Sequence, residues 1–199
     1  MKARGTRRPY HMVARAESVA ATREQILDAA VETFWSAPTT EIPLDGVASL
    51  AGVSLQTLIR HFGSKKGLLA AAVQRETSRV QRQRDEAPAG DVEGIVRVLL
   101  NHYEDLGDRV LRVLAEEQRT EQLRELVDIG RATHKAWCER VFASALSELQ
   151  GVERQRRLAQ LVAICDVYTW KLLRRDARLS RRQTELALVE LLQALMEAS

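Results

Sequence analysis

Apolar residues recur at three- and four-residue spacing along most of the chain from residue 23 onward. The apolar positions of the first run are Ile26, Leu27, Ala30, Val31 and Phe34. Thr22 followed by Gln25 matches a helix capping box, and Pro38 cannot continue a helix. This pattern predicts a first helix over residues 23–36.

Two shorter helices are predicted to follow and to meet across a tight turn. Pro43 suits the first turn of a helix, and an apolar stripe follows at Leu44, Val47, Ala48 and Ala51. Gly52 can adopt the positive φ of a sharp exit. Ser54 can then cap a new helix, in which Leu58 and Phe62 fall on one inward face.

The rest of the chain also has a helical pattern. A fourth helix is expected to open at Ser64 and to end before Pro88. Further amphipathic stretches cover 91–105, 108–117, 120–149, 152–175 and 181–197, with breaks at Gly107 and Gly151 and a possible split near Gly130. Leu, Ala, Arg and Glu dominate the composition, which favours helices. We expect an all-α fold, with an N-terminal three-helix helix-turn-helix domain and a C-terminal helical ligand-binding and dimerisation domain.

Residues 44–63 carry the spacing of a helix-turn-helix, whose second helix enters the major groove of DNA. With Val53, Leu58 and Phe62 turned inward, the outer face consists of Leu55, Gln56, Thr57, Ile59, Arg60 and His61. Glutamine pairs with adenine, arginine with guanine, and a leucine can contact a thymine methyl. Ser54, Thr57 and Lys65 are placed to bind phosphate. The alternative is that these are two packed helices of a bundle.

The segment TREQILDAAVETFWSAPTTEIPLDGVASLAGVSLQTLIRHFGSKKGLLAAAVQRE resembles the DNA-binding region of tetracycline-repressor (TetR) family regulators. The matching positions are Ala48, Ala51, Gly52, Val53, Ser54, Thr57, Leu58, Phe62, Lys65 and Leu68. The resemblance implies a dimeric repressor, in which a shift of the fourth helix changes the spacing of the two recognition helices. One position departs from the family pattern, because Ile59 replaces the usual Tyr that contacts the DNA backbone.

These patterns suggest a division into a flexible basic arm over 1–20, a helix-turn-helix domain over 21–68 and an effector-binding and dimerisation domain over 69–199. Residues 1–82 hold 12 Lys/Arg and 7 Asp/Glu, net +5, whereas residues 83–199 hold 18 and 20, net −2. The basic front end is therefore the one expected to meet DNA. Within the arm, basic side chains either follow a DNA groove or are passively solvated.

The last two amphipathic segments are apolar on more than one face, which favours a partner helix over a solvated surface. A two-fold homodimer interface is expected to include Leu161, Cys165, Tyr168, Leu188, Leu192 and Leu195. Such a dimer matches a palindromic double-stranded operator. The alternative is that the core of a monomer buries both faces.

A possible effector pocket lies in the C-terminal part. His134, Trp137, Cys138 and Val141 share one helical face, and Tyr103, His102, Asp166 and Trp170 are candidates to join it from neighbouring helices. An apolar lining with a few polar atoms suits a small apolar or aromatic effector. The alternative for each residue is an ordinary place in the core.

The sequence carries no catalytic, Walker-type or Rossmann motif, so we expect no enzyme and no cofactor. Two cysteines without metal-ligand spacing read as reduced thiols of a cytoplasmic protein, and no apolar run is long enough to span a membrane. The function predicted is a repressor released from its operator by a small molecule. The rival is a helical interaction protein of the same architecture that has lost DNA binding, to which Ile59 draws attention.

Overall fold

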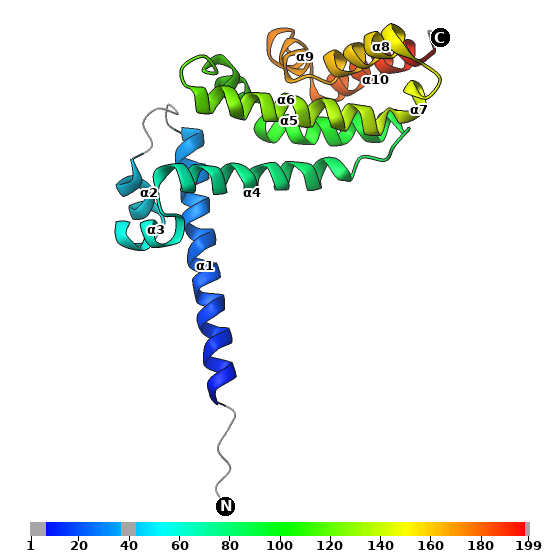
Figure 1. The fold of residues 1–199 in the computed structure, drawn as a ribbon. Coiled ribbons are helices and arrows are strands. Elements are labelled where there is room, and N and C mark those ends of the chain that lie inside the picture. Colours follow the sequence, from blue (N-terminus) through cyan, green and yellow to red (C-terminus); the bar gives the residue numbers. More distant parts are fainter. Residues whose placement is uncertain (1–6, 37–42, 198–199) are drawn as a thin grey trace, which may run out of the picture. The chain divides into compact units, whose positions relative to one another are not determined.

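The computed structural model describes residues 7–36 and 43–197, and the regular structure in these ranges is helical (Figure 1). The helices are α1 (Arg7–Ser36), α2 (Leu44–Leu50), α3 (Leu55–Phe62), α4 (Lys65–Asp85), α5 (Val92–Ala115), α6 (Glu121–Val141), α7 (Ala143–Leu146), α8 (Gly151–Ile164), α9 (Val167–Lys171), the π-helical turn η1 (Leu172–Asp176) and α10 (Arg181–Glu197). The all-α expectation is confirmed. Within the described ranges, no helix has both the length and the apolar character needed to cross a membrane.

The chain divides into two compact units, and the boundary lies within α4. Unit 1 ends at Glu76 and unit 2 begins at Thr77, so α4 contributes residues to both. The sequence-based division between residues 68 and 69 falls two turns earlier in the same helix.

Helix α1 begins much earlier than the sequence pattern predicted, at Arg7 instead of near residue 23. The hydroxyl of Thr22 donates to the carbonyl of Ser18 at 2.9 Å, a bond within a helix and not a cap. The reason is that residues 7–22 hold four alanines and three arginines, which favour a helix even without an apolar face. Residues 1–6 of the predicted arm, and the segment around Pro38, lie outside the described residues.

The core of unit 1 is formed by α1, α2, α3 and the first half of α4. Its buried residues are Ile26, Leu27, Ala29, Ala30, Val47, Ala48, Leu58, Leu68 and Ala72. Arg75 of α4 also binds α1 through ion pairs to Glu24 at 3.3 Å and Asp28 at 2.8 Å. These contacts hold α2 and α3 against α1 and α4, which fixes the position of α3.

The turn between α2 and α3 has the predicted geometry. Gly52 adopts φ +67°, a conformation that residues with a Cβ atom rarely take. The amide of Val53 donates to the carbonyl of Ala48 at 2.9 Å, which closes the turn. The prediction of two short helices across a glycine turn is confirmed.

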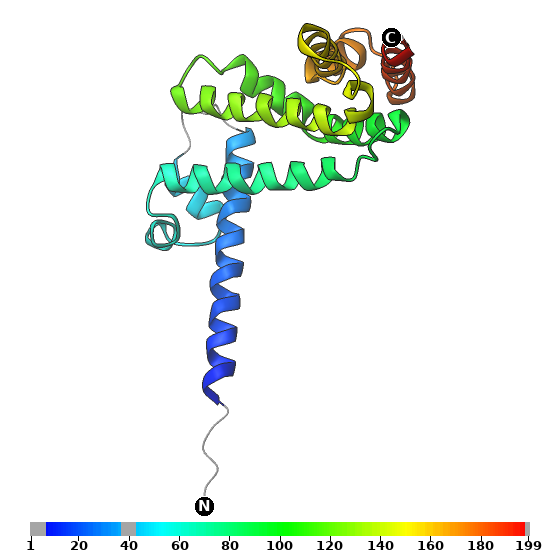
Figure 2. The ribbon, with the colours of Figure 1, turned by 45° about the vertical axis from the view of Figure 1, so that its right-hand side comes forward.

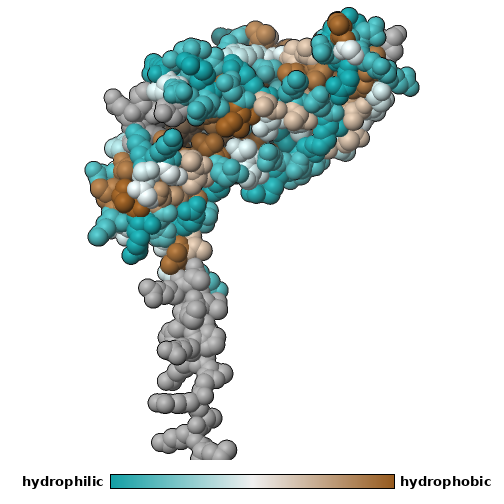
Figure 3. Space-filling view, viewed as in Figure 1, coloured by the Kyte–Doolittle hydropathy of each residue, from teal (hydrophilic) through white to brown (hydrophobic). Residues whose placement is uncertain are grey.

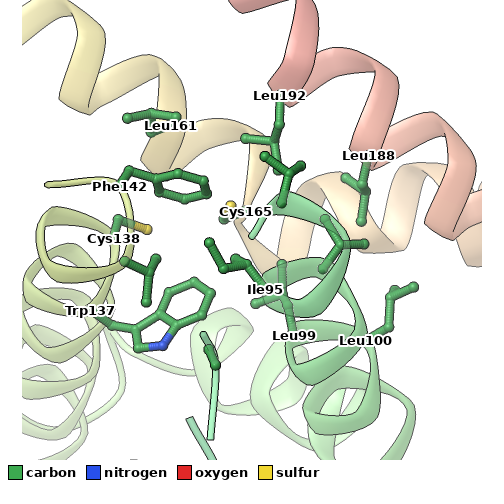
Figure 4. Close-up of a cluster of buried hydrophobic side chains, with 14 of the residues drawn as sticks. Ile95, Leu99, Leu100, Trp137, Cys138, Phe142, Leu161, Cys165, Leu188 and Leu192 are labelled. Atoms are coloured by element: carbon green, nitrogen blue, oxygen red, sulfur yellow. The ribbon is translucent and has the colours of Figure 1, made fainter. Parts of the chain in front are cut away.

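In unit 2, α5 packs against α6, α9 and α10, so it lies at the centre of the helical body. The two views agree that α5 and α6 run side by side (Figures 1 and 2). Figure 4 shows how side chains from α5, α6, α8 and α10 meet in the core. The labelled residues are Ile95, Leu99, Leu100, Trp137, Cys138, Phe142, Leu161, Cys165, Leu188 and Leu192.

The glycines predicted as breaks near residues 107 and 130 do not end helices. Gly107 lies inside α5, and the Trp170 ring occupies the space where a side chain would be: a Cβ atom on Gly107 would lie 2.5 Å from the ring. Gly130 lies inside α6 with open space around it. Helix α5 instead ends at Ala115, and α6 ends at Val141.

Most residues expected at a dimer contact are instead part of the core of a single protomer. Leu161, Cys165 and Leu192 are 0% exposed and Leu188 is 1% exposed, and Leu195 packs against the same cluster. These residues are buried because α10 packs against α5 and α8, and α8 also packs against α6. Of the predicted set, Tyr168 remains exposed.

Candidate nucleic-acid interface and effector site

Helix α3 is capped as the sequence predicted. The Ser54 hydroxyl accepts a hydrogen bond from the Thr57 amide at 3.1 Å, and the two hydroxyls are 3.0 Å apart. Gly63, at φ +74°, ends the helix, and its amide donates to the carbonyl of Ile59 at 2.7 Å. Both ends of this short helix are therefore fixed by local hydrogen bonds.

The two faces of α3 differ in burial as expected. Leu58 is fully buried, and Phe62 packs against the same core. On the opposite side Gln56 and Arg60 are exposed. Leu55 and Ile59 are exposed too, and Figure 3 shows apolar side chains reaching the surface over α2 and α3. The face therefore combines donors and acceptors for base edges with apolar groups for methyl or sugar contacts.

The predicted phosphate-binding residues lie at the beginnings of α3 and α4. Ser54 is exposed, whereas Thr57 and Lys65 are partly exposed. Because each hydroxyl offers one donor and two acceptor sites, the Ser54–Thr57 contact leaves one hydroxyl proton free for a phosphate oxygen. His61 is half-buried, with its ring tilted against Phe62 at a centroid separation of 6.2 Å. Helix α3 carries no acidic residue that would repel DNA.

In unit 2, four of the predicted pocket residues gather around Arg84, which belongs to the last turn of α4. The Arg84 guanidinium donates to Nδ1 of His134 at 3.0 Å and lies 5.1 Å from the centre of the Trp137 ring. It lies 6.0 Å from the centre of the Tyr103 ring. The Sγ atom of Cys138 is 3.9 Å from Nε2 of His134. His134, Trp137, Tyr103 and Cys138 are all buried.

The remaining predicted pocket residues have structural contacts of their own. Trp170 donates from Nε1 to Glu104 at 3.3 Å, and its ring lies 5.9 Å from that of Tyr103. Asp166 caps α9 by accepting from the Tyr168 amide at 2.9 Å. Val141 is a core residue, 1% exposed. For these three, the interpretation as ordinary structural residues fits the contacts better.

Burial shifts the titration of several groups around Arg84. Desolvation, helped by the nearby Arg84 charge, lowers the pKa of His102 to about 3, so this imidazole is neutral at physiological pH. Burial raises the pKa of Tyr103, whose hydroxyl donates to the carbonyl of Cys165 at 2.9 Å. A hydrogen bond between the two thiols lowers the pKa of Cys138 and raises that of Cys165.

Arg84 is the residue that the sequence pattern did not single out. It follows Arg79 and Arg82 in a polar stretch of α4, and nothing in the local sequence separates one arginine from the others. The distinguishing fact is burial: Arg84 is 6% exposed, whereas Arg79 and Arg82 are exposed. That fact depends on which face of α4 lies against α5 and α6, and the sequence pattern does not define it.

The geometry of α2, the glycine turn and α3 defines a helix-turn-helix protein. Residues 26–72 match the model of the family described as bacterial regulatory proteins, tetR family. These residues carry the DNA-binding region of the TetR family. Over 78 residues it is 39% identical to an uncharacterised HTH-type transcriptional regulator of Mycobacterium tuberculosis, with the same identity in two strains. The match spans 39% of this chain and 39% of the length of each relative.

Solved structures share the fold over most of the chain. FadR from Bacillus subtilis in complex with stearoyl-CoA is 19% identical with a TM-score of 0.63, covering 85% of this chain and 96% of that one. The SmeT–triclosan complex is 22% identical with a TM-score of 0.64, covering 87% and 91%. At these identities the likeness shows the fold alone.

Proposed function

We propose that this chain is a transcriptional repressor that binds operator DNA through α3. The observation that carries the proposal is the division of α3 into a face anchored by Leu58 and an exposed face with Gln56 and Arg60. Gln56 can pair with an adenine and Arg60 with a guanine, each through two hydrogen bonds. Ser54, Thr57 and Lys65 would bind phosphates, Leu55 and Ile59 would contact methyl or sugar groups, and His61 flanks the contact.

The repressor is proposed to act as a homodimer on a palindromic operator. Exposed apolar side chains on the C-terminal helices support this part: Val152, Tyr168, Leu172, Leu186 and Leu191. A second copy of the chain would cover apolar groups that water otherwise surrounds. In this arrangement the two copies of α3 would read two half-sites about one helical turn of DNA apart.

The dimer is tested by sedimentation of the variant L186E/L191E beside L55E, which places the same charge on an exposed leucine of α3. We expect the first variant to sediment as a monomer, whereas L55E stays a dimer. A double variant that still sediments as a dimer would place the interface elsewhere and remove these leucines from the proposal.

Control by a small-molecule effector completes the proposal. Unit 2 holds buried polar and aromatic side chains around Arg84, which is a composition that suits ligand recognition. Two proteins of the same fold were solved with stearoyl-CoA and with triclosan. Because Arg84 belongs to α4, a ligand that binds it would act directly on the helix that also carries Leu68 and Ala72 of the unit 1 core.

The proposal is tested by selecting bound sequences from a random duplex pool with the purified full-length protein. We expect a palindrome to be enriched. When the selection is repeated with Q56A, we expect a different sequence or a weaker enrichment. The matched control is Q118A, which truncates an exposed glutamine outside α3. Selection of nothing by a folded protein, with and without candidate effectors, would contradict DNA binding.

One observation favours a second candidate, a helical interaction protein that has lost DNA binding. Ile59 is 37% exposed at the position where the family usually carries a tyrosine hydroxyl, so a phosphate donor is missing from the centre of α3. This candidate predicts that no duplex is enriched and that I59Y restores binding. If the wild type already enriches a palindrome, the second candidate is excluded.

A further inference from the structure

Arg84 is a buried guanidinium without a carboxylate partner among the described residues. It is 6% exposed, and its Nη1 donates to Nδ1 of His134 at 3.0 Å. Its Nε has no hydrogen-bond partner in the described part of the chain. By contrast, Arg174 in the same unit binds both oxygens of Glu104, at 2.7 and 3.1 Å.

The neighbours of Arg84 do not neutralise its charge. His134 accepts from Arg84 at Nδ1, so its ring proton lies on Nε2, which is 3.4 Å from the carbonyl oxygen of Val162. The Trp137 and Tyr103 rings offer only the weak attraction of aromatic faces. Asp166 affects the pKa of Tyr103, but its carboxylate caps α9 and forms no ion pair with Arg84.

A second polar group near Arg84 also lacks a partner. His102 is 4% exposed, and its Nδ1 has no hydrogen-bond partner among the described residues. The Arg84 charge contributes to keeping this imidazole neutral, so the two groups are electrostatically coupled. Buried polar groups are normally paired, and a buried charge is normally matched by an opposite one. Two unsatisfied groups in one region therefore indicate a missing binding partner.

We infer that Arg84 is the anion-binding residue of unit 2, and that its ligand is an organic carboxylate with an apolar or aromatic body. A single guanidinium matches one negative charge, and a carboxylate fits the planar donor fork of arginine. The Trp137 and Tyr103 rings, both 3% exposed, supply an environment for the apolar body. The inference rests on the proposed effector response, and it adds the chemical class of the effector.

The occupied site acts on α4, because Arg84 lies in the last turn of this helix. A carboxylate that pairs with Arg84 relieves the unpaired charge, so the ligand stabilises the arrangement in which the guanidinium is buried. Ligand binding therefore favours the position of α4 in which the Arg84 guanidinium is buried.

The test uses the full-length protein and matched probe pairs: 4-phenylbutanoate with 4-phenylbutanamide, and decanoate with decanamide. Calorimetry and melting temperature are measured for the wild type, R84M and the control R119M, in which the replaced arginine is exposed. We expect the wild type and R119M to bind at least one carboxylate about tenfold or more tightly than its amide. R84M is expected to lose that preference.

Melting without any probe separates a binding role from a structural one. Met is close to Arg in length and removes the unpaired charge, while the backbone carbonyl of residue 84 still accepts from Trp137 Nε1, at 3.0 Å in the wild type. We therefore expect R84M to melt at the wild-type temperature or above it. Two combined results would overturn the inference. In both, R84M melts at a clearly lower temperature than the wild type, and the wild type either binds acid and amide equally or binds no acid.

Two further measurements are made. The first distinguishes an organic carboxylate from inorganic phosphate, and the second distinguishes failure of the effector role from failure of the Arg84 site. If inorganic phosphate stabilises the wild type as much as the carboxylates do, the organic ligand class is wrong. Affinity for the selected duplex is measured in the same samples. A carboxylate that binds through Arg84 without changing DNA affinity contradicts the effector role alone, whereas unchanged carboxylate binding in R84M contradicts the site alone.

Discussion

In unit 1 the side chains with candidate chemistry lie outside, and in unit 2 they lie inside. Gln56 and Arg60 of α3 are exposed above a core that contains Leu58. Arg84 and His102 are buried at 6% and 4% exposure within the helical body. An exposed polar face can bind a large partner such as DNA without rearrangement, whereas buried polar groups can be reached only by a small molecule. The contrast supports assigning DNA binding to unit 1 and ligand binding to unit 2.

The largest expected effect comes from removing the anchor of α3. L58A removes a side chain that is 0% exposed, so we expect unit 1 to lose about 2–5 kcal/mol of stability. The control L55A truncates a leucine of the same helix that is 40% exposed, and it should change stability by about 0.5 kcal/mol or less. Hydrogen exchange, compared between residues 44–62 and 92–115, measures each unit separately. Equal acceleration in both ranges by L58A would contradict independent cores.

In unit 2 a pair of glycines offers a matched comparison. G107A would bring a Cβ atom to 2.5 Å from the Trp170 ring, so overpacking should cost about 1–3 kcal/mol. G130A lies in open space within α6, and it should stabilise the protein by up to about 1 kcal/mol, because alanine favours helices. Urea unfolding measures both variants. Shifts of the same sign would mean that the Gly107–Trp170 contact does not govern the packing of α5 and α9.

The burial of His102 predicts a pH dependence of stability. Its pKa falls from 6.5 in the unfolded chain to about 3 in the folded protein, so below pH 6.5 the unfolded chain binds a proton that the folded protein does not. The free energy of unfolding should therefore decrease as pH falls, by up to about 2 kcal/mol between pH 6.5 and 5.

The measurement is urea unfolding at several pH values for the wild type and H102Q. The other histidines are unchanged in the variant, so their contribution cancels in the difference between the two curves. We expect H102Q to lose less stability on acidification. Parallel curves for the two proteins would show that His102 titrates normally and would weaken the argument for a polar site in the core.

The sequence predicted unit 1 more completely than unit 2, for physical reasons that particular residues illustrate. In unit 1 the turn at Gly52, the helix cap at Ser54 and the buried contact of Leu58 depend on local geometry. They can therefore be predicted from the sequence alone. Gly107 has the same appearance as a helix break, yet it faces Trp170, which lies 63 residues later in the chain. Contacts of that kind depend on how helices pack, and local spacing carries no information about them.

The same limit explains the site residues. Exposure of Gln56 and Arg60 follows from the inward placement of Leu58 on a short helix, which the helical period determines. Leu161 and Leu188 instead were expected at a dimer contact, because their helices are apolar on several faces. In the structure those faces are occupied by core contacts, which place both residues below 2% exposure. Arg84 was missed for the related reason that its burial depends on tertiary packing.

DNA affinity as a function of salt tests the central claim, that α3 reads an operator, most directly. It should be measured for the wild type, R60A and the control R119A, on the selected duplex and on a scrambled one. The account predicts that wild-type affinity falls steeply as salt rises. R60A should weaken binding to the selected duplex by about 5- to 150-fold and remove its preference over the scrambled duplex, whereas R119A leaves both unchanged. Affinity that is insensitive to salt, or an unchanged preference in R60A, would contradict the account.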